Sequence, residues 1–75
     1  MEIMDLKKLV YFITIAEEGQ ITRAANRLHI GQPPLSMQLK ALEDELGVML
    51  IKRNNKIFEL TPAGETFYKR AKEVI

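Results

Sequence analysis

The sequence predicts a mainly α-helical domain in which one two-stranded hairpin separates the third helix from the fourth. Apolar residues recur at steps of three or four in four stretches, the pattern of helices with one buried face. Between residues 48 and 60 this period gives way to two short apolar runs around a pair of asparagines. The chain has 75 residues, 47% hydrophobic and 28% charged, which fits one ordered domain and excludes a disordered chain.

The first two predicted helices are short and end at turn-forming residues. Asp5 is the expected N-cap of the first helix, and Gly19 is expected to end it. Its buried face is predicted to contain Leu6, Leu9, Val10, Ile13 and Ala16. The second helix follows Gln20, a poor N-cap residue, and Gly31 is expected to provide positive φ in the turn after it. Its buried face is predicted to contain Ile21, Ala24, Ala25 and Leu28.

The third predicted helix, residues 33–46, has a strongly apolar face and an exposed face. Its first turn contains two prolines, which are tolerated there, and Gly47 ends it. The buried face is predicted to contain Leu35, Leu39, Leu42 and Leu46. The opposite side, with Ser36 on its flank, carries Pro33, Met37, Lys40, Ala41 and Asp44. The exposed N-terminal half therefore lacks a carboxylate.

The last predicted elements are a hairpin and a fourth helix. Strands at residues 48–51 and 57–60 are expected to flank a turn at Asn54 and Asn55, since asparagine tolerates the left-handed conformations of tight turns. Thr61 is expected to cap a helix over residues 62–75. This helix carries an apolar stripe of Ala63, Phe67, Ala71 and Val74, widened by Tyr68 and Ile75. It reaches the last residue without a capping signal, which predicts a piece of a longer protein.

These elements, in this order, are those of a winged helix-turn-helix domain followed by a C-terminal linker helix. The helix-turn-helix is predicted at about residues 21–40 and the wing at about residues 48–60, within a domain at 4–61. The DNA major groove is about 12 Å wide and admits one α-helix. The N-terminus of a helix also favours phosphate. The third helix is therefore the predicted reader of DNA.

The charges are distributed as DNA binding requires, although the net charge is only +1. Residues 19–42 and residues 46–58 contain basic residues and no acidic ones. An acidic block of Glu43, Asp44 and Glu45 separates them and is expected to form a solvated face. Two acid-free basic stretches predict a polarised surface.

A long motif closely resembles the N-terminal domain of LysR-type transcriptional regulators, over about residues 4 to 75. The matching residues are Ala24-Ala25-x-x-Leu28, Gln32-Pro33-x-Leu35-Ser36-x-Gln38, Leu42-Glu43-x-x-Leu46-Gly47-x-x-Leu50, Arg53 and Leu60-Thr61-x-Ala63-Gly64. The resemblance implies a promoter-binding domain that acts in the cytoplasm. In the family, a separate domain senses a small-molecule effector. That domain is expected to lie outside these residues, and no cofactor is predicted for this chain.

The resemblance also assigns roles to individual residues. It places Gln32, Pro33, Pro34 and Ser36 in the major groove and Thr22 against phosphate. It places Lys56 where the wing enters the minor groove and Arg53 on the DNA backbone. Met37 stands where the family often has arginine, which predicts contact with a thymine methyl instead of guanine. With the exposed Lys40, the predicted DNA-binding residues are Thr22, Gln32, Pro33, Pro34, Ser36, Met37, Lys40, Arg53 and Lys56.

The fourth helix is predicted to form a homodimer. Its apolar stripe is wider than packing against the rest of a small domain requires. Left uncovered, the stripe would form an exposed apolar patch of the kind that monomers avoid. The resemblance implies antiparallel pairing of two such helices. The predicted interface contains Ala63, Phe67, Tyr68, Ala71, Val74 and Ile75. A two-fold dimer would bind an inverted repeat, and the resemblance leaves open a tetramer of the longer protein.

Several of these residues also have an alternative interpretation that involves no DNA or partner chain. Met37 is then a solvent-exposed methionine without a DNA contact. Arg53 is then an ion-pair partner of Glu43 or Glu59. In the corresponding alternative for the fourth helix, Phe67, Tyr68 and Ala71 pack on the core of their own domain instead of on a partner chain.

Other classes of function compete less well. A protein-interaction module is also built on winged helices, but it requires neither an acid-free helix N-terminus nor a basic wing. An enzyme is excluded because no paired carboxylates share a face with a nucleophile and no glycine-rich phosphate loop occurs. With no cysteine and a single histidine, His29, no metal site is predicted. No apolar run is long enough to predict a membrane span.

Overall fold

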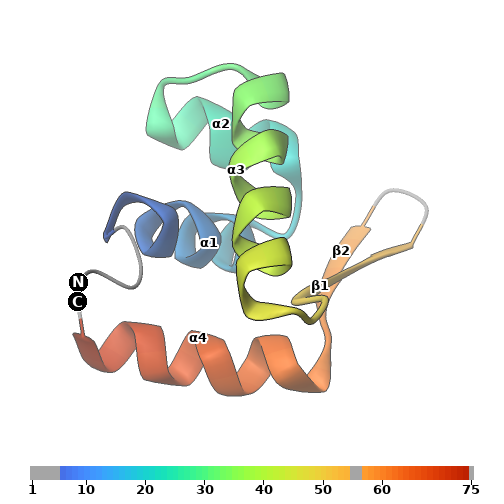
Figure 1. The fold of residues 1–75 in the computed structure, drawn as a ribbon. Helices are drawn as coiled ribbons and strands as arrows, with labels where there is room; N and C mark the ends of the chain where they lie inside the picture. The colour runs from blue at the N-terminus through green and yellow to red at the C-terminus, as the bar shows by residue number, and fades with distance from the viewer. Residues whose placement is uncertain (1–5, 55–56, 75) are drawn as a thin grey trace.

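The predicted order of four helices and one antiparallel hairpin is confirmed in the computed structural model (Figure 1). The structure describes residues 6–54 and 57–74, with residues 53, 54 and 57 described by their backbone. The elements are α1 Leu6–Glu18, α2 Ile21–Leu28, α3 Gln32–Leu46, β1 Ile51–Asn54, β2 Ile57–Leu60 and α4 Pro62–Val74. Helix α1 packs against α2, α3 and α4, and the hairpin projects away from the helices (Figure 1). The expected cap Asp5 lies outside the described residues.

The buried face of α1 differs from the prediction. Leu9 and Ile13 are buried as expected, but Leu6 and Val10 are exposed, and Phe12 is fully buried. The reason is that α1 is covered from two sides, by α2 and α3 and also by α4. The Phe12 ring meets that of Phe67 on α4 edge-on, with centroids 5.3 Å apart. The core of the domain therefore includes Phe12, which the helical spacing alone left out.

The turn of the helix-turn-helix uses a different left-handed residue from the one predicted. His29 has φ 59°, whereas Gly31 has φ −77° and is the extended N-cap of α3. The backbone N–H of Ile30 donates to the carbonyl of Ala25 at 3.0 Å, so the end of α2 is closed by backbone hydrogen bonds. Gln20 makes no side-chain cap bond, which confirms that it is a poor N-cap.

The first strand begins three residues later than predicted, at Ile51 instead of Val48. Strand β1 pairs with β2 in a register that joins Ile51 to Leu60 and Asn54 to Ile57. The segment before it is held instead by Glu43, whose carboxylate accepts the backbone N–H groups of Leu50 at 2.8 Å and Ile51 at 3.1 Å. A tertiary contact therefore replaces the strand ladder here. The turn residue Asn55 lies outside the described residues.

The predicted cap of α4 is confirmed at Thr61. Its hydroxyl accepts the N–H of Gly64 at 2.9 Å and donates to the carbonyl of Met49 at 2.7 Å. Its own N–H donates to the carbonyl of Leu50 at 3.0 Å. The first turn of α4 thus sits directly on the backbone of residues 49 and 50. None of the helices over the described residues has the length and apolarity needed to cross a membrane.

Candidate nucleic-acid interface

The N-terminal half of α3 presents the surface that the sequence predicts. Gln32, Pro33 and Pro34 are exposed in its first turn, and Ser36 is half-buried on its flank. Met37 is 70% exposed, the largest exposure among the large apolar side chains that the structure describes. The first turn of α3 contains no acidic residue. This surface offers amide, hydroxyl and apolar groups without repelling phosphate.

The leucines on the opposite side hold this surface in place. Leu35, Leu39 and Leu42 are buried against the other helices, as predicted, and Leu46 is half-buried. Ala24 and Ala25 of α2 are also buried, and their small side chains let the neighbouring helices α1 and α3 approach α2 closely. An α-helix fixed along one side by such packing can enter a groove with the other.

The cations of the acid-free stretches fall into two groups in the folded chain. Arg27 forms ion pairs with Glu17 at 3.0 Å and Glu18 at 3.1 Å, although both acids lie in another helix. Lys40 lies 3.9 Å from Asp44, one turn along α3, and both side chains are largely exposed. A pair so exposed contributes little, so Lys40 remains available to an anion. Arg27, by contrast, is engaged by two carboxylates of α1, although its side chain is exposed.

The residue-by-residue prediction of the site from the sequence did not include two further cations, Arg23 and Lys52. Arg23, next to the exposed Thr22 on α2, and Lys52 on β1 are exposed. Neither forms an ion pair with any residue over 6–54 and 57–74. The signal for them was present in the sequence, since both lie in the acid-free stretches. Arg23 and Lys52 therefore join Thr22 and Lys40 as groups suited to phosphate.

The wing is anchored to the helix-turn-helix by its backbone. The N–H of Phe58 on β2 donates to the carbonyl of Gly19, between α1 and α2, at 3.1 Å. Arg53 lies in β1, where its backbone pairs with Phe58. Lys56 lies outside the described residues. The position of β1 and β2 relative to α3 is thus fixed from both ends, by Gly19 and by Glu43.

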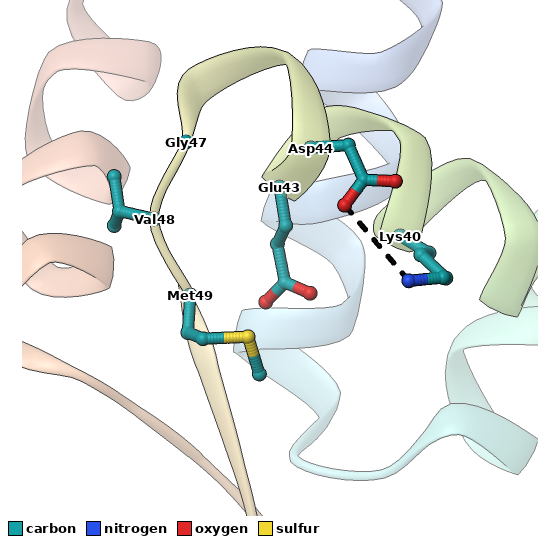
Figure 2. Close-up of a pocket in the computed structure, with 6 residues that line it drawn as sticks. All are labelled: Lys40, Glu43, Asp44, Gly47, Val48 and Met49. Carbon is teal, nitrogen blue, oxygen red and sulfur yellow. Dashed lines mark ion pairs between the residues drawn. The ribbon is translucent and has the colours of Figure 1, made fainter.

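Glu43 does not belong to a solvated acidic face. The alternative in which it pairs with Arg53 depends on a side chain outside the described residues, so it stays a prediction. Its side chain is 6% exposed, because its carboxylate is directed from α3 toward the backbone of residues 50 and 51. Figure 2 shows this carboxylate between the segment from Gly47 to Met49 and the Lys40–Asp44 pair, and these residues line a pocket of about 380 Å³. The signal in the sequence was its position four residues after Leu39, beside the buried face.

The apolar stripe predicted for α4 divides between two faces of the helix. Ala71 is 3% exposed and packs in the core of its own domain, with Tyr68 and Phe67 partly buried against it. Ala63 and Phe67 line a groove of about 420 Å³ with residues 46, 48 and 50. Val74 is 69% exposed, and Ile75 lies outside the described residues. Ala71 is therefore already covered within one chain and has no surface to offer a second one.

The fold and this surface define a winged helix-turn-helix domain. The family model described as "Bacterial regulatory helix-turn-helix protein, lysR family" matches residues 6–65. The chain belongs to this family.

Individual relatives and solved structures agree with that assignment. The transcriptional regulator BsdA of Bacillus subtilis (strain 168) is 60% identical over 73 residues, which are 96% of this chain and 25% of BsdA. A crystal structure of a CbnR_DBD–DNA complex superposes with a TM-score of 0.91 at 45% identity, covering 95% of this chain and 82% of that one. A BenM_DBD/catB site 1 DNA complex gives 0.92 at 44% identity, covering 95% and 79%. The chain spans about a quarter of the length of BsdA.

Proposed function

We propose that this chain binds double-stranded promoter DNA sequence-specifically, with α3 in the major groove and the β1–β2 hairpin in the minor groove. The observation that carries the proposal is the exposed, acid-free N-terminal half of α3. It is supported by the DNA complexes of the CbnR and BenM domains, which are 44–45% identical to this chain. The relatives are named as transcriptional regulators, which supports a binding domain and not an enzyme.

The proposal divides the site between base readers and phosphate contacts. Gln32 and Ser36 carry the polar groups of the α3 surface, so they are assigned to base edges, with Pro33 and Pro34 in apolar contact beside them. Phosphate contacts are assigned to Thr22, Arg23, Lys40 and Lys52, with Arg53 and Lys56 assigned from the family resemblance. Phosphate contacts position a protein on DNA, and base contacts give it sequence preference.

The salt dependence of binding tests the proposal. A dimer that neutralises roughly 6–8 phosphates should show a slope of log K against log salt on the order of −5 to −7. The measurement is a titration of duplex sites selected from a random library, repeated at several salt concentrations. Binding that does not respond to salt, or no binding to any duplex at low ionic strength, would contradict the proposal in favour of a protein-interaction module.

Met37 is expected to read an apolar feature of the DNA. Because the side chain is 70% exposed on the α3 surface and donates no hydrogen bond, it suits contact with a thymine methyl. We expect Met37→Arg to create a preference for guanine at the base pair below this position, since arginine binds guanine through two hydrogen bonds worth about 1–3 kcal/mol of discrimination. Sites selected by parent and variant should therefore differ at one position in each half-site. Identical selected sites would show that Met37 points to solvent.

We further propose a homodimer through residues 62–75, bound to an inverted repeat. The groove lined by Ala63 and Phe67 also includes Thr66 and Arg70, and Val74 follows Phe67 on the same side of the helix at i+7. This side of α4 therefore keeps apolar groups beside one cation after Ala71 is covered. A helix of a second copy fits such a face. The two-fold axis then sets two α3 helices about one turn of DNA, or a multiple, apart.

Val74→Asp is expected to weaken this dimer without unfolding the domain, because Val74 is 69% exposed. Phe67→Asp would be a poorer test, since the Phe67 ring also packs on Phe12. Sedimentation at increasing protein concentration should show a lower proportion of dimer for the variant. Asn26→Asp on α2 makes the same change of charge away from α4 and should sediment like the parent. Equal dimerisation of Val74→Asp and the parent would place the interface elsewhere.

For the whole protein we propose a cytoplasmic transcription regulator, a tetramer being one of its possible assemblies. This follows from relatives about four times as long as the matched region, which are named as transcriptional regulators. A small-molecule effector would then act through the part of such a protein outside these residues, as the family resemblance implies.

A further inference from the structure

One carboxylate on α1 joins the helix-turn-helix to α4. The Glu17 side chain accepts a hydrogen bond from Arg27 of α2 at 3.0 Å through one oxygen. Its other oxygen accepts the Tyr68 hydroxyl at 2.9 Å and the Lys72 ammonium at 3.0 Å, both from α4. A single residue therefore contacts two helices that belong to different functional parts of the domain.

The neighbouring acid, Glu18, makes only one of these three contacts. It pairs with Arg27 at 3.1 Å but not with Tyr68 or Lys72. Both glutamate side chains are 26% exposed, and both lie in the last turn of α1. The chain thus contains two matched acids of which Glu17 alone reaches α4.

The other contacts of α4 leave its far end less defined. The first turn is fixed by Thr61 and Gly64 against residues 49 and 50. Beyond it, Phe67 and Ala71 pack through apolar contacts, which have no preferred direction. A helix of 13 residues is about 20 Å long, so a small rotation about the fixed end displaces the other end by several ångströms. The hydrogen bonds to Glu17 restrain that rotation.

We propose that Glu17 is a positioning residue that sets the distance between the two half-sites the dimer recognises. This inference rests on the proposed function, in which α4 carries the second copy. If α4 holds the partner, its angle to α3 decides how far apart the two α3 helices lie. Glu17 controls that angle through Tyr68 and Lys72, although neither Glu17 nor these two residues is assigned a contact with DNA.

The charge state of the cluster is consistent with this role. The hydrogen bond from Lys72, followed by that from Tyr68, lowers the pKa of Glu17 below its usual range. The same contacts raise the pKa of Lys72 and of Tyr68. At neutral pH the carboxylate is therefore ionised and Lys72 is protonated, which strengthens the hydrogen bonds between them.

The test compares Glu17→Ala with Glu18→Ala on duplexes that carry two identical half-sites separated by spacers of different length. The parent is expected to prefer one spacing. Glu17→Ala should lower the ratio of affinity between this spacing and its neighbours on the order of threefold, the size expected for partly exposed ion pairs. The preferred bases within each half-site should not change. Glu18→Ala, the matched control, should keep the spacing preference of the parent.

A double variant shows whether Glu17 acts through α4. Tyr68→Phe combined with Lys72→Met removes the α4 half of the cluster and should broaden the spacing preference as Glu17→Ala does. Adding Glu17→Ala to that pair should then have no further effect on spacing. Thermal unfolding of each variant identifies any general loss of structure.

The outcomes separate the inference from the proposed function. A parent that binds no inverted repeat contradicts the proposed dimeric DNA binding itself. A parent with a preferred spacing that Glu17→Ala retains overturns the inference, even if affinity falls equally at every spacing. Equal broadening by Glu17→Ala and Glu18→Ala would overturn it too, because the effect would then arise from Arg27.

Discussion

Gly64→Ala is expected to lower the free energy of unfolding by more than about 3 kcal/mol, although alanine is the better helix former. A Cβ at this position would overlap the carbonyl oxygen of Leu50 and lie 3.0 Å from its carbonyl carbon. The obstacle is backbone, and the Leu50 carbonyl is also held by the N–H of Thr61. The first turn of α4 can therefore accept the methyl group only by moving away from the base of the wing.

Thermal unfolding followed by circular dichroism measures this effect. For a domain of this size, 3 kcal/mol corresponds to a fall in Tm of roughly 12–24 °C. Ala63→Gly is the matched control, because it exchanges the same two residue types one position earlier, at an exposed site. It should cost no more than about 1 kcal/mol, the difference in helix propensity. A Tm of Gly64→Ala equal to that of the parent would mean that α4 does not lie against Leu50.

Helical periodicity predicted most of the fold because each helix has one face buried by its neighbours. The spacing of the leucines of α3 and of the small residues of α2 located both helices to within one residue. It failed where burial comes from more than one side, as at Phe12, which α4 covers as well. It failed again at Val48, because the segment before β1 is held by a side chain seven residues upstream of Leu50 and not by a partner strand.

The sequence predicted which residues of the candidate site are exposed better than it predicted which cations are free of ion pairs. The exposed face of α3 follows from local spacing, so Gln32 and Met37 were placed correctly as exposed residues. The availability of a cation depends instead on acids that are distant in sequence. Arg27 lies in an acid-free stretch and yet pairs with Glu17 and Glu18, whereas Arg23 remains available.

The same limit applies to α4. One apolar stripe in sequence serves two surfaces in the structure, since Ala71 packs within the domain and Val74 is exposed. Periodicity shows that a face of the helix is apolar, but it does not show whether the same domain or a second chain covers that face. For this reason the assignment of the dimer interface depends on exposure in the folded chain.

Glu43→Ala is expected to destabilise the domain by about 2–4 kcal/mol and to weaken DNA binding at all sequences. The carboxylate accepts two backbone N–H groups, those of Leu50 and Ile51, and both residues are buried. Removing it leaves two buried donors without a partner, each costing about 1–3 kcal/mol, less whatever a water molecule restores. The base of the wing then loses its link to α3, so Lys52, an exposed cation of β1, is no longer held at one position relative to the groove.

Two further variants make the test specific. Glu43→Gln keeps the shape and one acceptor oxygen but loses the charge, so it should cost about 1–2 kcal/mol, between parent and alanine. Glu45→Ala removes an exposed acid of the same block, whose ion-pair partner among the described residues is Lys8 at 3.4 Å, and should change stability by no more than about 1 kcal/mol. Unfolding by urea gives the three free energies, and titration of one selected duplex gives the affinities. If Glu43→Ala were as stable as Glu45→Ala, the carboxylate would not hold the wing, and β1 would have to be positioned by its pairing with β2 and the contact at Gly19 alone.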